Sequence, residues 1–403
     1  MSTDHPLLRI RGVRKYFPVR AGLLRRTVGQ VHAVDGVDLD VRVGETLGLV
    51  GETGCGKSTL ARCMTRLHEL TAGSVVFDGH NLSKLSPAQL QPHRRQLQMI
   101  FQDPYGALNP RRRVGSIIGD PFAIHGIDGR VERRRRVQEL MERVGLNPEH
   151  YNCFPADFSG VQRQRIGIAR ALALQPKLLI CDEPVSALDV SIQAQVLNLL
   201  LDLQDEFGLT YVFISHDLSV IRHVSDRVAL MYLGRVVETA PAGELFRTAR
   251  HPYTRALLSA LPVPDPDAAD SRERIVLTGE VPSPVAPPSG CRFHTRCPKA
   301  QPDCVAVDPS LVPVLGDPAS HTTACLHPLA VGEDLSRARA ATSHTDFEAG
   351  PMVGVSARGA PGPGTRPPRL RTIDRGKRGR RAASKAAARG RWLGPGCAGT
   401  AWP

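Results

Sequence analysis

A glycine-rich loop that ends in Lys-Ser is the first group of residues in this sequence that could do chemistry. It fits the pattern G-x-x-x-x-G-K-[ST], in which backbone N–H groups wrap phosphate oxygens at the positive end of a helix. Lys57 would then reach the terminal phosphates, and the Ser58 hydroxyl would bind Mg²⁺. A chance glycine-rich turn is the alternative, which average composition predicts in roughly one unrelated chain of this length in a hundred. The residues of this phosphate loop are Gly51, Glu52, Thr53, Gly54, Cys55, Gly56, Lys57 and Ser58.

A pair of acids, Asp182 and Glu183, follows the apolar run Leu178 to Cys181. Ligands of open α/β sheets collect at the carboxyl ends of strands, so both carboxylates are expected at a ligand site. One can hold Mg²⁺, and the other can orient or deprotonate water. Two acids that merely cap the next helix are the alternative, and the phosphate loop elsewhere in the chain weakens it.

The elements that must position these residues alternate between strand and helix. An apolar strand should run from Glu45 to Val50 before the loop, and a helix from Lys57 to Leu67 after it. Alternation of this kind predicts an α/β fold with a mainly parallel sheet. The first 45 residues add short β-like runs. The elements expected beyond Gln164 are helix Arg165 to Leu174, strand Lys177 to Cys181, helix Ile192 to Phe207, strand Thr210 to Ile214 and helix Ser219 to Val224.

Composition divides the chain into three parts. Residues 1–260 hold the alternating elements, with an Arg-rich helical insert at about 85–165 whose clearest helix is Val131 to Val144. Residues 261–330 form a Pro- and Cys-bearing accessory region. Residues 331–403 are dominated by Arg, Gly, Ala and Pro, so we expect a basic, low-complexity, disordered tail.

The net charge of +13 belongs mostly to the tail. Residues 331–403 carry 14 Lys and Arg against 5 Asp and Glu, which leaves 38 against 34 in the rest of the chain. Because the tail lacks interleaved aromatic residues, a solvated charged segment is favoured over nucleic-acid binding through it. No window of 18 apolar residues occurs, and nine cysteines without a signal peptide indicate a reducing compartment.

Several motifs together resemble those of ABC-type ATPases, in the order of that family and across about residues 7–260. The stretch 158–162, Phe-Ser-Gly-Val-Gln, resembles the signature motif that separates these ATPases from other phosphate-loop enzymes. Gln102 in Ile-Phe-Gln-Asp-Pro looks like the Q-loop, and residues 186–189 look like the D-loop. His216 in Ile-Ser-His-Asp looks like the switch histidine. The resemblance implies an ABC ATPase domain with a helical subdomain and an antiparallel β region.

Further stretches are similar to the ATPase subunits of oligopeptide and dipeptide importers. These are Asn-Pro-Arg at 109–111, the run 181–195, His-Pro-Tyr-Thr at 251–254 and the cysteine segment near 291. The opening at 16–37 is most similar to the F-type member of the two ATPase subunits. The resemblance implies ATP hydrolysis that drives import of peptides, or of a related small solute such as nickel. A non-transport ABC ATPase is the alternative.

The resemblance also assigns roles. Tyr16 would stack on adenine, Glu183 would activate the attacking water, and His216 would contact the γ-phosphate. Mg²⁺ would be held by Ser58 and Asp182 and sensed by Gln102. The other nucleotide-binding positions would be the phosphate loop with Thr59, and the signature residues Ser159, Gly160 and Gln162.

The implied partners form a complex at the membrane. ATPase domains of this family meet head to tail, so the second one would be a D-type subunit or another copy of this chain. Two membrane permease subunits and an extracytoplasmic solute-binding protein would complete the importer. The chain would lie peripherally on the cytoplasmic face of the cell membrane.

One residue departs from the family pattern. The signature normally reads Ser-Gly-Gly-Gln, whereas this chain has Val161 at the second glycine. A β-branched side chain disfavours positive φ and restricts close approach to a ligand. We therefore expect the composite site that uses this signature to be weak or silent, while the site that uses Lys57 and Glu183 stays active.

Cys291, Cys297, Cys304 and Cys325 are separated by gaps of five, six and twenty residues, unlike the C-x-x-C pairs of common zinc sites. Related importer ATPases carry cysteines in this arrangement, and the resemblance implies four thiolates round a [4Fe-4S] cluster. Free thiols in a folded extension are the alternative. The remaining cysteines before residue 260 are expected to be structural.

Overall fold

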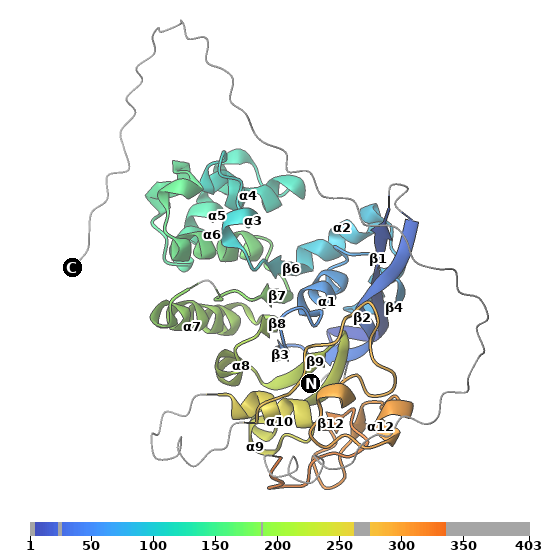
Figure 1. The fold of residues 1–403 in the computed structure, drawn as a ribbon. Coiled ribbons are helices and arrows are strands. Elements are labelled where there is room, and N and C mark those ends of the chain that lie inside the picture. The colour runs from blue at the N-terminus through green and yellow to red at the C-terminus, as the bar shows by residue number, and fades with distance from the viewer. Residues whose placement is uncertain (1–4, 23–25, 187, 262–274, 336–403) are drawn as a thin grey trace, which may run out of the picture. The chain divides into compact units, whose positions relative to one another are not determined.

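The computed structural model describes residues 5–22, 26–186, 188–261 and 275–335. The predicted tail therefore lies, apart from 331–335, outside the described residues. Within the described ranges the chain forms two β-sheets with helices packed on them, which confirms the predicted α/β class (Figure 1).

The smaller sheet is antiparallel and comes mainly from the start of the chain. Its strand order is β2-β1-β4-β5. Buried and more exposed residues alternate near the start of β1 (residues 8–10) and near the end of β2 (residues 37–41), as expected where one face of a sheet is covered. Its strands are β1 (Leu8–Ala21), β2 (Arg26–Val41), β4 (Ala72–Phe77) and β5 (His80–Asn81).

The larger sheet holds the parallel strands predicted from the alternation. Its order is β11-β12-β10-β9-β3-β8-β7-β6, and the pairs among β9, β3, β8, β7 and β6 are parallel. The central strands β3, β7 and β8 are buried throughout, which explains their continuous apolar sequences. The strands are β3 (Thr46–Val50), β6 (Leu97–Ile100), β7 (Leu178–Asp182), β8 (Thr210–Ser215), β9 (Arg227–Tyr232), β10 (Arg235–Pro241), β11 (Val312–Pro313) and β12 (Thr322–Thr323).

Side chains alternate between the two faces of this sheet and feed two separate cores. On β8, Val212 and Ile214 join the core that α1 and the smaller sheet complete, whereas Tyr211 and Phe213 join the core that contains α4 to α8. Helices α4, α5 and α6 pack on one another as a group (Figure 1). The α-helices are α1 (Lys57–Met64), α2 (Pro87–Gln96), α3 (Pro104–Ala107), α4 (Val114–Ile124), α5 (Arg130–Arg143), α6 (Gly160–Leu172), α7 (Val190–Phe207), α8 (Leu218–Val224), α9 (Ala242–Thr248), α10 (Pro252–Ser259) and α12 (Asp303–Ala306).

The end of α1 and the position of β6 differ from the sequence prediction. Helix α1 ends at Met64 rather than Leu67, and the next residue with an unusual backbone is Arg66, at φ 54°. Strand β6 lies inside the segment expected to be helical, yet it pairs with β7 in the larger sheet. The helices predicted near 131–144, 165–174, 192–207 and 219–224 are present as α5, α6, α7 and α8.

The Cys-bearing region is joined to the larger sheet through β12, which pairs with β10. Within the described ranges there are four short 3₁₀ helices: η1 (Leu82–Lys84), η2 (Pro148–Asn152), η3 (Pro155–Asp157) and η4 (His294–Arg296). In the part of the chain that the structure describes, no helix is both long enough and apolar enough to cross a membrane.

Candidate active site

The phosphate loop leaves β3 at Val50 and enters α1 at Lys57. Gly56 caps the helix in the left-handed region at φ 109°, and a Cβ there would lie 2.0 Å from the carbonyl oxygen of Ala33. Only glycine fits this position. The Lys57 ammonium lies folded across the loop, donating to the carbonyl oxygens of Gly51 at 2.7 Å and Glu52 at 3.1 Å. The loop thus holds a buried cation among backbone groups.

The first acid of the predicted pair faces the end of this loop. Asp182 is the last residue of β7, and its Oδ1 accepts from the Ser58 hydroxyl at 2.9 Å. Burial raises the pKa of Asp182, although the hydrogen bond from Ser58 opposes that shift. A buried carboxylate beside a hydroxyl is a donor set that suits Mg²⁺, whose charge would stabilise the ionised form.

The second acid lies between two polar side chains from other elements. Gln102, just after β6, donates from Nε2 to Glu183 Oε2 at 2.8 Å. His216, just after β8, places Nδ1 3.3 Å from Glu183 Oε1. Glu183 has φ 47°, which is uncommon for a residue with a side chain, and its N–H donates to the carbonyl of Ile214 on β8 at 3.0 Å. The ends of β6, β7 and β8 therefore bring Gln102, Glu183 and His216 together.

Tyr16 lies on β1 and does not join that cluster. Its hydroxyl donates to Asp35 Oδ1, and its ring lies 4.3 Å from that of His32 between centroids. Burial raises the pKa of Tyr16, and the hydrogen bond to Asp35 adds to the effect. The ring is half-buried, and the predicted contact with adenine stays a prediction.

The signature residues are also apart from the cluster. Ser159 caps α6 in a reciprocal capping box, in which its Oγ accepts from Gln162 N at 3.3 Å and Gln162 Oε1 accepts from Ser159 N at 3.0 Å. Both side chains are exposed, and among the described residues no hydrogen bond or ion pair joins them to the phosphate loop or to Glu183. The two side chains therefore present polar groups at the start of α6.

Val161 does not have the positive φ at which a β-branched side chain would be disfavoured. Val161 lies within the first turn of α6, next to Gly160, so its backbone is helical and does not have positive φ. Its side chain is partly buried against the core that contains α4 and α6. Because a β-branched residue costs little in a helix, the fold tolerates valine there. Its effect on a bound partner stays a prediction.

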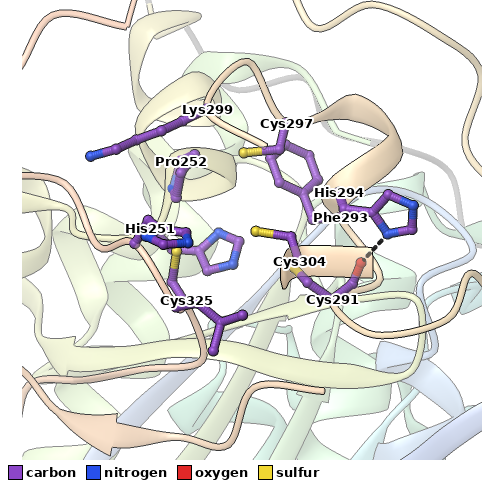
Figure 2. A pocket seen from close by; sticks show the side chains of 11 residues that line it. His251, Pro252, Cys291, Phe293, His294, Cys297, Lys299, Cys304 and Cys325 are labelled. Atoms are coloured by element: carbon purple, nitrogen blue, oxygen red, sulfur yellow. Dashed lines mark hydrogen bonds between the residues drawn. The ribbon is translucent and has the colours of Figure 1, made fainter. Parts of the chain in front are cut away.

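The four cysteines of the accessory region line one hollow together with Phe293 and His251 (Figure 2). Burial raises the pKa of Cys291, and it raises the pKa of Cys297 and of Cys325 to about 12 in each case. The thiols are close enough to influence one another electrostatically. Separately, one ligand atom each of Asp303, Cys304 and His327 lies within 4.8 Å of the others. Either set of donors could hold a metal.

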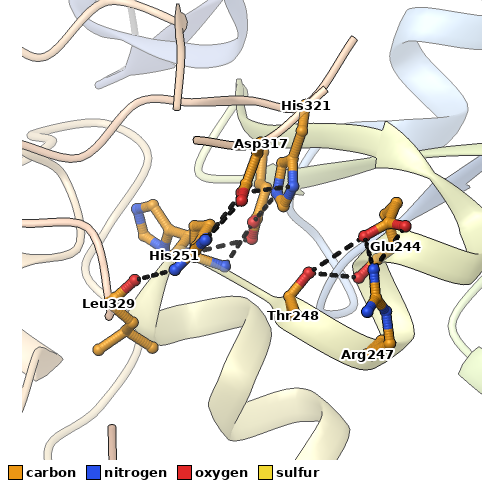
Figure 3. Close-up of polar contacts among 9 residues, drawn as sticks. Glu244, Arg247, Thr248, His251, Asp317, His321 and Leu329 are labelled. Carbon is orange, nitrogen blue, oxygen red and sulfur yellow. Dashed lines mark hydrogen bonds and ion pairs between the residues drawn. The ribbon is translucent and has the colours of Figure 1, made fainter. Parts of the chain in front are cut away.

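A buried network of charged groups ties this region to β10 (Figure 3). The Glu238 carboxylate accepts from the backbone N–H groups of Arg250 at 2.6 Å and His251 at 3.1 Å, and lies 2.8 Å from His321 Nε2. Asp317 pairs with His321 at 3.0 Å and with Arg250 through two guanidinium nitrogens. Because these side chains come from both parts of the chain, the accessory region is fixed in place.

Two residues near the phosphate loop were not singled out by the sequence analysis. The Tyr253 hydroxyl accepts from the backbone N–H of Glu52 at 3.0 Å, and Arg296 pairs with the Glu52 carboxylate at 2.8 Å. Tyr253 lies in the His-Pro-Tyr-Thr stretch at 251–254, so the resemblance to importer ATPases already indicated that this stretch matters. Nothing in the sequence pattern connects Arg296 to a loop 244 positions earlier.

The site combines a glycine-rich loop with a hydroxyl and two acids at the carboxyl edge of a parallel sheet. Such groups can bind a nucleoside triphosphate with Mg²⁺ and position water for attack. The fold and the site thus define a phosphate-loop ATPase with a separate helical part that carries the signature.

Comparison with known proteins specifies this class further. Residues 34–186 match the ABC transporter family, and residues 237–304 match the family described as oligopeptide/dipeptide transporter, C-terminal region. The chain is 56% identical to the oligopeptide transport ATP-binding protein AppF of Bacillus subtilis over 75% of this chain and 92% of that protein. It is 51% identical to the dipeptide transport ATP-binding protein DppF of Haemophilus influenzae, over 77% of this chain and 94% of that protein.

A solved structure agrees with these sequence matches. The ATP-binding cassette MJ0796, a dimer bound to ADP and phosphate, is 28% identical, with a TM-score of 0.53 over 58% of this chain and 98% of that one. The chain belongs to the ABC transporter family, in the group of oligopeptide and dipeptide transport ATP-binding proteins.

Proposed function

We propose that this chain hydrolyses ATP to drive import of peptides, as the nucleotide-binding subunit of an ABC importer. The observation that carries the proposal is the cluster in which Ser58 meets Asp182 while Gln102 and His216 flank Glu183. The match to the C-terminal region of oligopeptide and dipeptide transporters supports peptide as the cargo.

In the proposed mechanism the loop N–H groups and Lys57 bind the β- and γ-phosphates, and Tyr16 stacks on adenine. Glu183 accepts a proton from the attacking water, because Gln102 and His216 hold its two oxygens in place. His216 has its ring exposed next to Glu183 and contacts the γ-phosphate. Ser58 and Asp182 would hold Mg²⁺, which neutralises charge that develops on the phosphates.

The second half of each ATP site comes from another molecule. Ser159 and Gln162 are exposed on α6 and bind the nucleotide of the partner in a head-to-tail dimer. The partner is a D-type ATPase subunit or a second copy of this chain. Two permease subunits and an extracytoplasmic solute-binding protein complete the importer, with this chain peripheral on the cytoplasmic face of the membrane.

The importer that contains this chain, reconstituted in vesicles, tests the proposal. We expect ATP hydrolysis to rise when the solute-binding protein and a mixture of short peptides are added, and Lys57→Ala to abolish it. Lys84→Ala, which changes an exposed lysine on η1, is the matched control. Hydrolysis stimulated by a nickel salt but not by peptides would reject the cargo, and hydrolysis that survives Lys57→Ala would reject the site.

We also propose that Cys291, Cys297, Cys304 and Cys325 hold a [4Fe-4S] cluster. The four side chains line one hollow, and thiolates are the usual ligands of such clusters (Figure 2). Burial raises the pKa of Cys297 and of Cys325, and bound iron would oppose this shift by stabilising their thiolate forms. The cluster would cross-link three separate stretches of the accessory region.

Anaerobic purification tests the cluster. We expect iron and acid-labile sulfide, with a broad absorbance near about 400 nm, that Cys297→Ser removes. Cys63→Ser on α1, also a buried thiol, should leave both unchanged. Protein that holds one zinc ion, and loses it in a His327→Ala variant, would instead assign the site to Asp303, Cys304 and His327.

A further inference from the structure

The segment between Cys291 and Cys297 contacts the phosphate loop directly. Arg296 donates from Nη1 to both carboxylate oxygens of Glu52, at 2.8 and 3.1 Å. Its side chain is 9% exposed and that of Glu52 is 23% exposed, so this ion pair is shielded from water far more than a surface pair. The ion pair between Arg296 and Glu52 can therefore restrain the phosphate loop at Glu52.

Glu52 is held by its backbone as well. Its N–H donates to the Tyr253 hydroxyl at 3.0 Å, and its carbonyl accepts from the Lys57 ammonium at 3.1 Å. Tyr253 in turn packs against Tyr232 with ring centroids 4.9 Å apart, and the Arg296 guanidinium lies over the Tyr232 ring. The position of Glu52 therefore depends on Arg296 on one side and affects Lys57 on the other.

A second contact from the same segment reaches the expected adenine side. Arg292, which is buried, donates to Asp35 and to the carbonyl of Leu233. Asp35 also accepts from the Tyr16 hydroxyl. A hollow bounded by Glu52 to Cys55 on one side and Val281 to Pro284 on the other lies along the loop. The accessory region thus borders the loop along several stretches.

We infer that Arg296 is a positioning residue for ATP: through Glu52 it fixes the phosphate loop and compensates the negative charge beside the phosphates. This inference rests on the proposed function of the loop. The accessory region is then part of the nucleotide site, and the affinity for ATP depends on the segment that the cysteines enclose.

The Arg296–Glu52 ion pair predicts how substitutions at these two residues combine in their effect on the ATP dissociation constant. Arg296→Met keeps the apolar stem of the side chain but leaves the Glu52 carboxylate without its partner, next to bound phosphate. The dissociation constant for ATP should rise about 10-fold, within the range of ordinary coupling between sites. In a Glu52→Gln background the carboxylate is already neutral, so the same Arg296→Met change should have less than about a 3-fold effect.

The experiment is a double-mutant cycle on the full chain. ATP and ADP dissociation constants are measured by calorimetry, and KM and kcat in the assembled importer. We expect KM to rise with kcat unchanged, because loop positioning acts on binding, and we expect Arg296→Lys to recover most of the affinity. Arg247→Ala, which breaks an exposed pair with Glu244, is the control and should change nothing.

Three results would overturn the inference. The first is an equal effect of Arg296→Met on the ATP dissociation constant in the wild-type and Glu52→Gln backgrounds. The second is a fall in kcat at unchanged KM. The third is a loss of ATP affinity that appears only in variants whose melting temperature has also fallen. Wild-type protein that binds no nucleotide would overturn the proposed function, and this inference with it. Wild-type binding together with an unaffected Arg296→Met variant would overturn this inference alone.

Discussion

Replacing Glu183 by Gln should separate ATP binding from ATP hydrolysis. In the structure Glu183 Oε2 accepts from Gln102 at 2.8 Å, and Oε1 lies 3.3 Å from His216 Nδ1. Glutamine has the same shape, so its oxygen can still accept from Gln102 and its amide group can face the His216 ring. The variant should therefore fold and bind ATP, and it lacks only a group that accepts a proton.

The size of the loss follows from that missing proton transfer. A positioned general base contributes about 10²- to 10⁴-fold, so kcat should fall by that factor, which means that the activation free energy rises by about 2.7 to 5.4 kcal/mol. The free energy of unfolding should change by less than about 0.5 kcal/mol, because no hydrogen bond within the described cluster is lost.

The assay measures phosphate release in a single turnover of pre-bound ATP, together with the dissociation constant for ATP. Glu149→Gln, which changes an exposed acid on η2, is the control and should keep the wild-type rate. A decrease in kcat of less than 10-fold with normal binding would refute Glu183 as the base. Loss of ATP binding would refute the argument that glutamine preserves the site.

Three further predictions follow from other parts of the structure. Glu238→Ala should lower the free energy of unfolding by about 3 to 5 kcal/mol, because it leaves the buried His321 and two backbone N–H groups without their acceptor. Glu244→Ala, in an exposed pair, should cost at most about 1 kcal/mol, and equal losses in urea denaturation would contradict this. The hydrogen bonds from Arg250 lower the pKa of Asp317 from 3.8, so its carboxylate stabilises the fold above that pH, and the gain is lost as the pH falls below 3.8. Asp317→Asn should flatten the dependence of unfolding free energy on pH below about pH 4, and an unchanged slope would be inconsistent with this. Val161→Gly should raise ATP hydrolysis by the assembled importer, and an unchanged rate would count against a weakened second site.

The sequence was sufficient to predict the parallel sheet, because continuous apolar runs and helical periods are local signals. It was insufficient for β6, whose four residues are too short to show a period and follow an Arg-rich helix. Only short β-like runs were expected in the first 45 residues, but pairing between β1 and β2 joins them into two long strands. Long-range pairing of this kind has no local sequence signal.

The same distinction holds for the site. Lys57, Asp182, Glu183 and His216 each follow a predicted strand or loop, so the topology of a parallel sheet was enough to bring them to one edge. The contacts of Arg292 and Arg296 depend instead on how the accessory region folds back. Their partners lie 257 and 244 positions away, and no spacing in the sequence encodes such a pairing.

The arrangement of the signature has a consequence for assembly. Ser159 and Gln162 satisfy each other in the capping box, and within the described ranges they contact neither the phosphate loop nor Glu183. In the proposed head-to-tail dimer, their exposed surface would act on the nucleotide that the partner binds. In a heterodimer the site with Lys57 and Glu183 would use the partner's signature, while Val161 would lie in the other site. Hydrolysis in the two sites should then differ, since only one of them contains the valine.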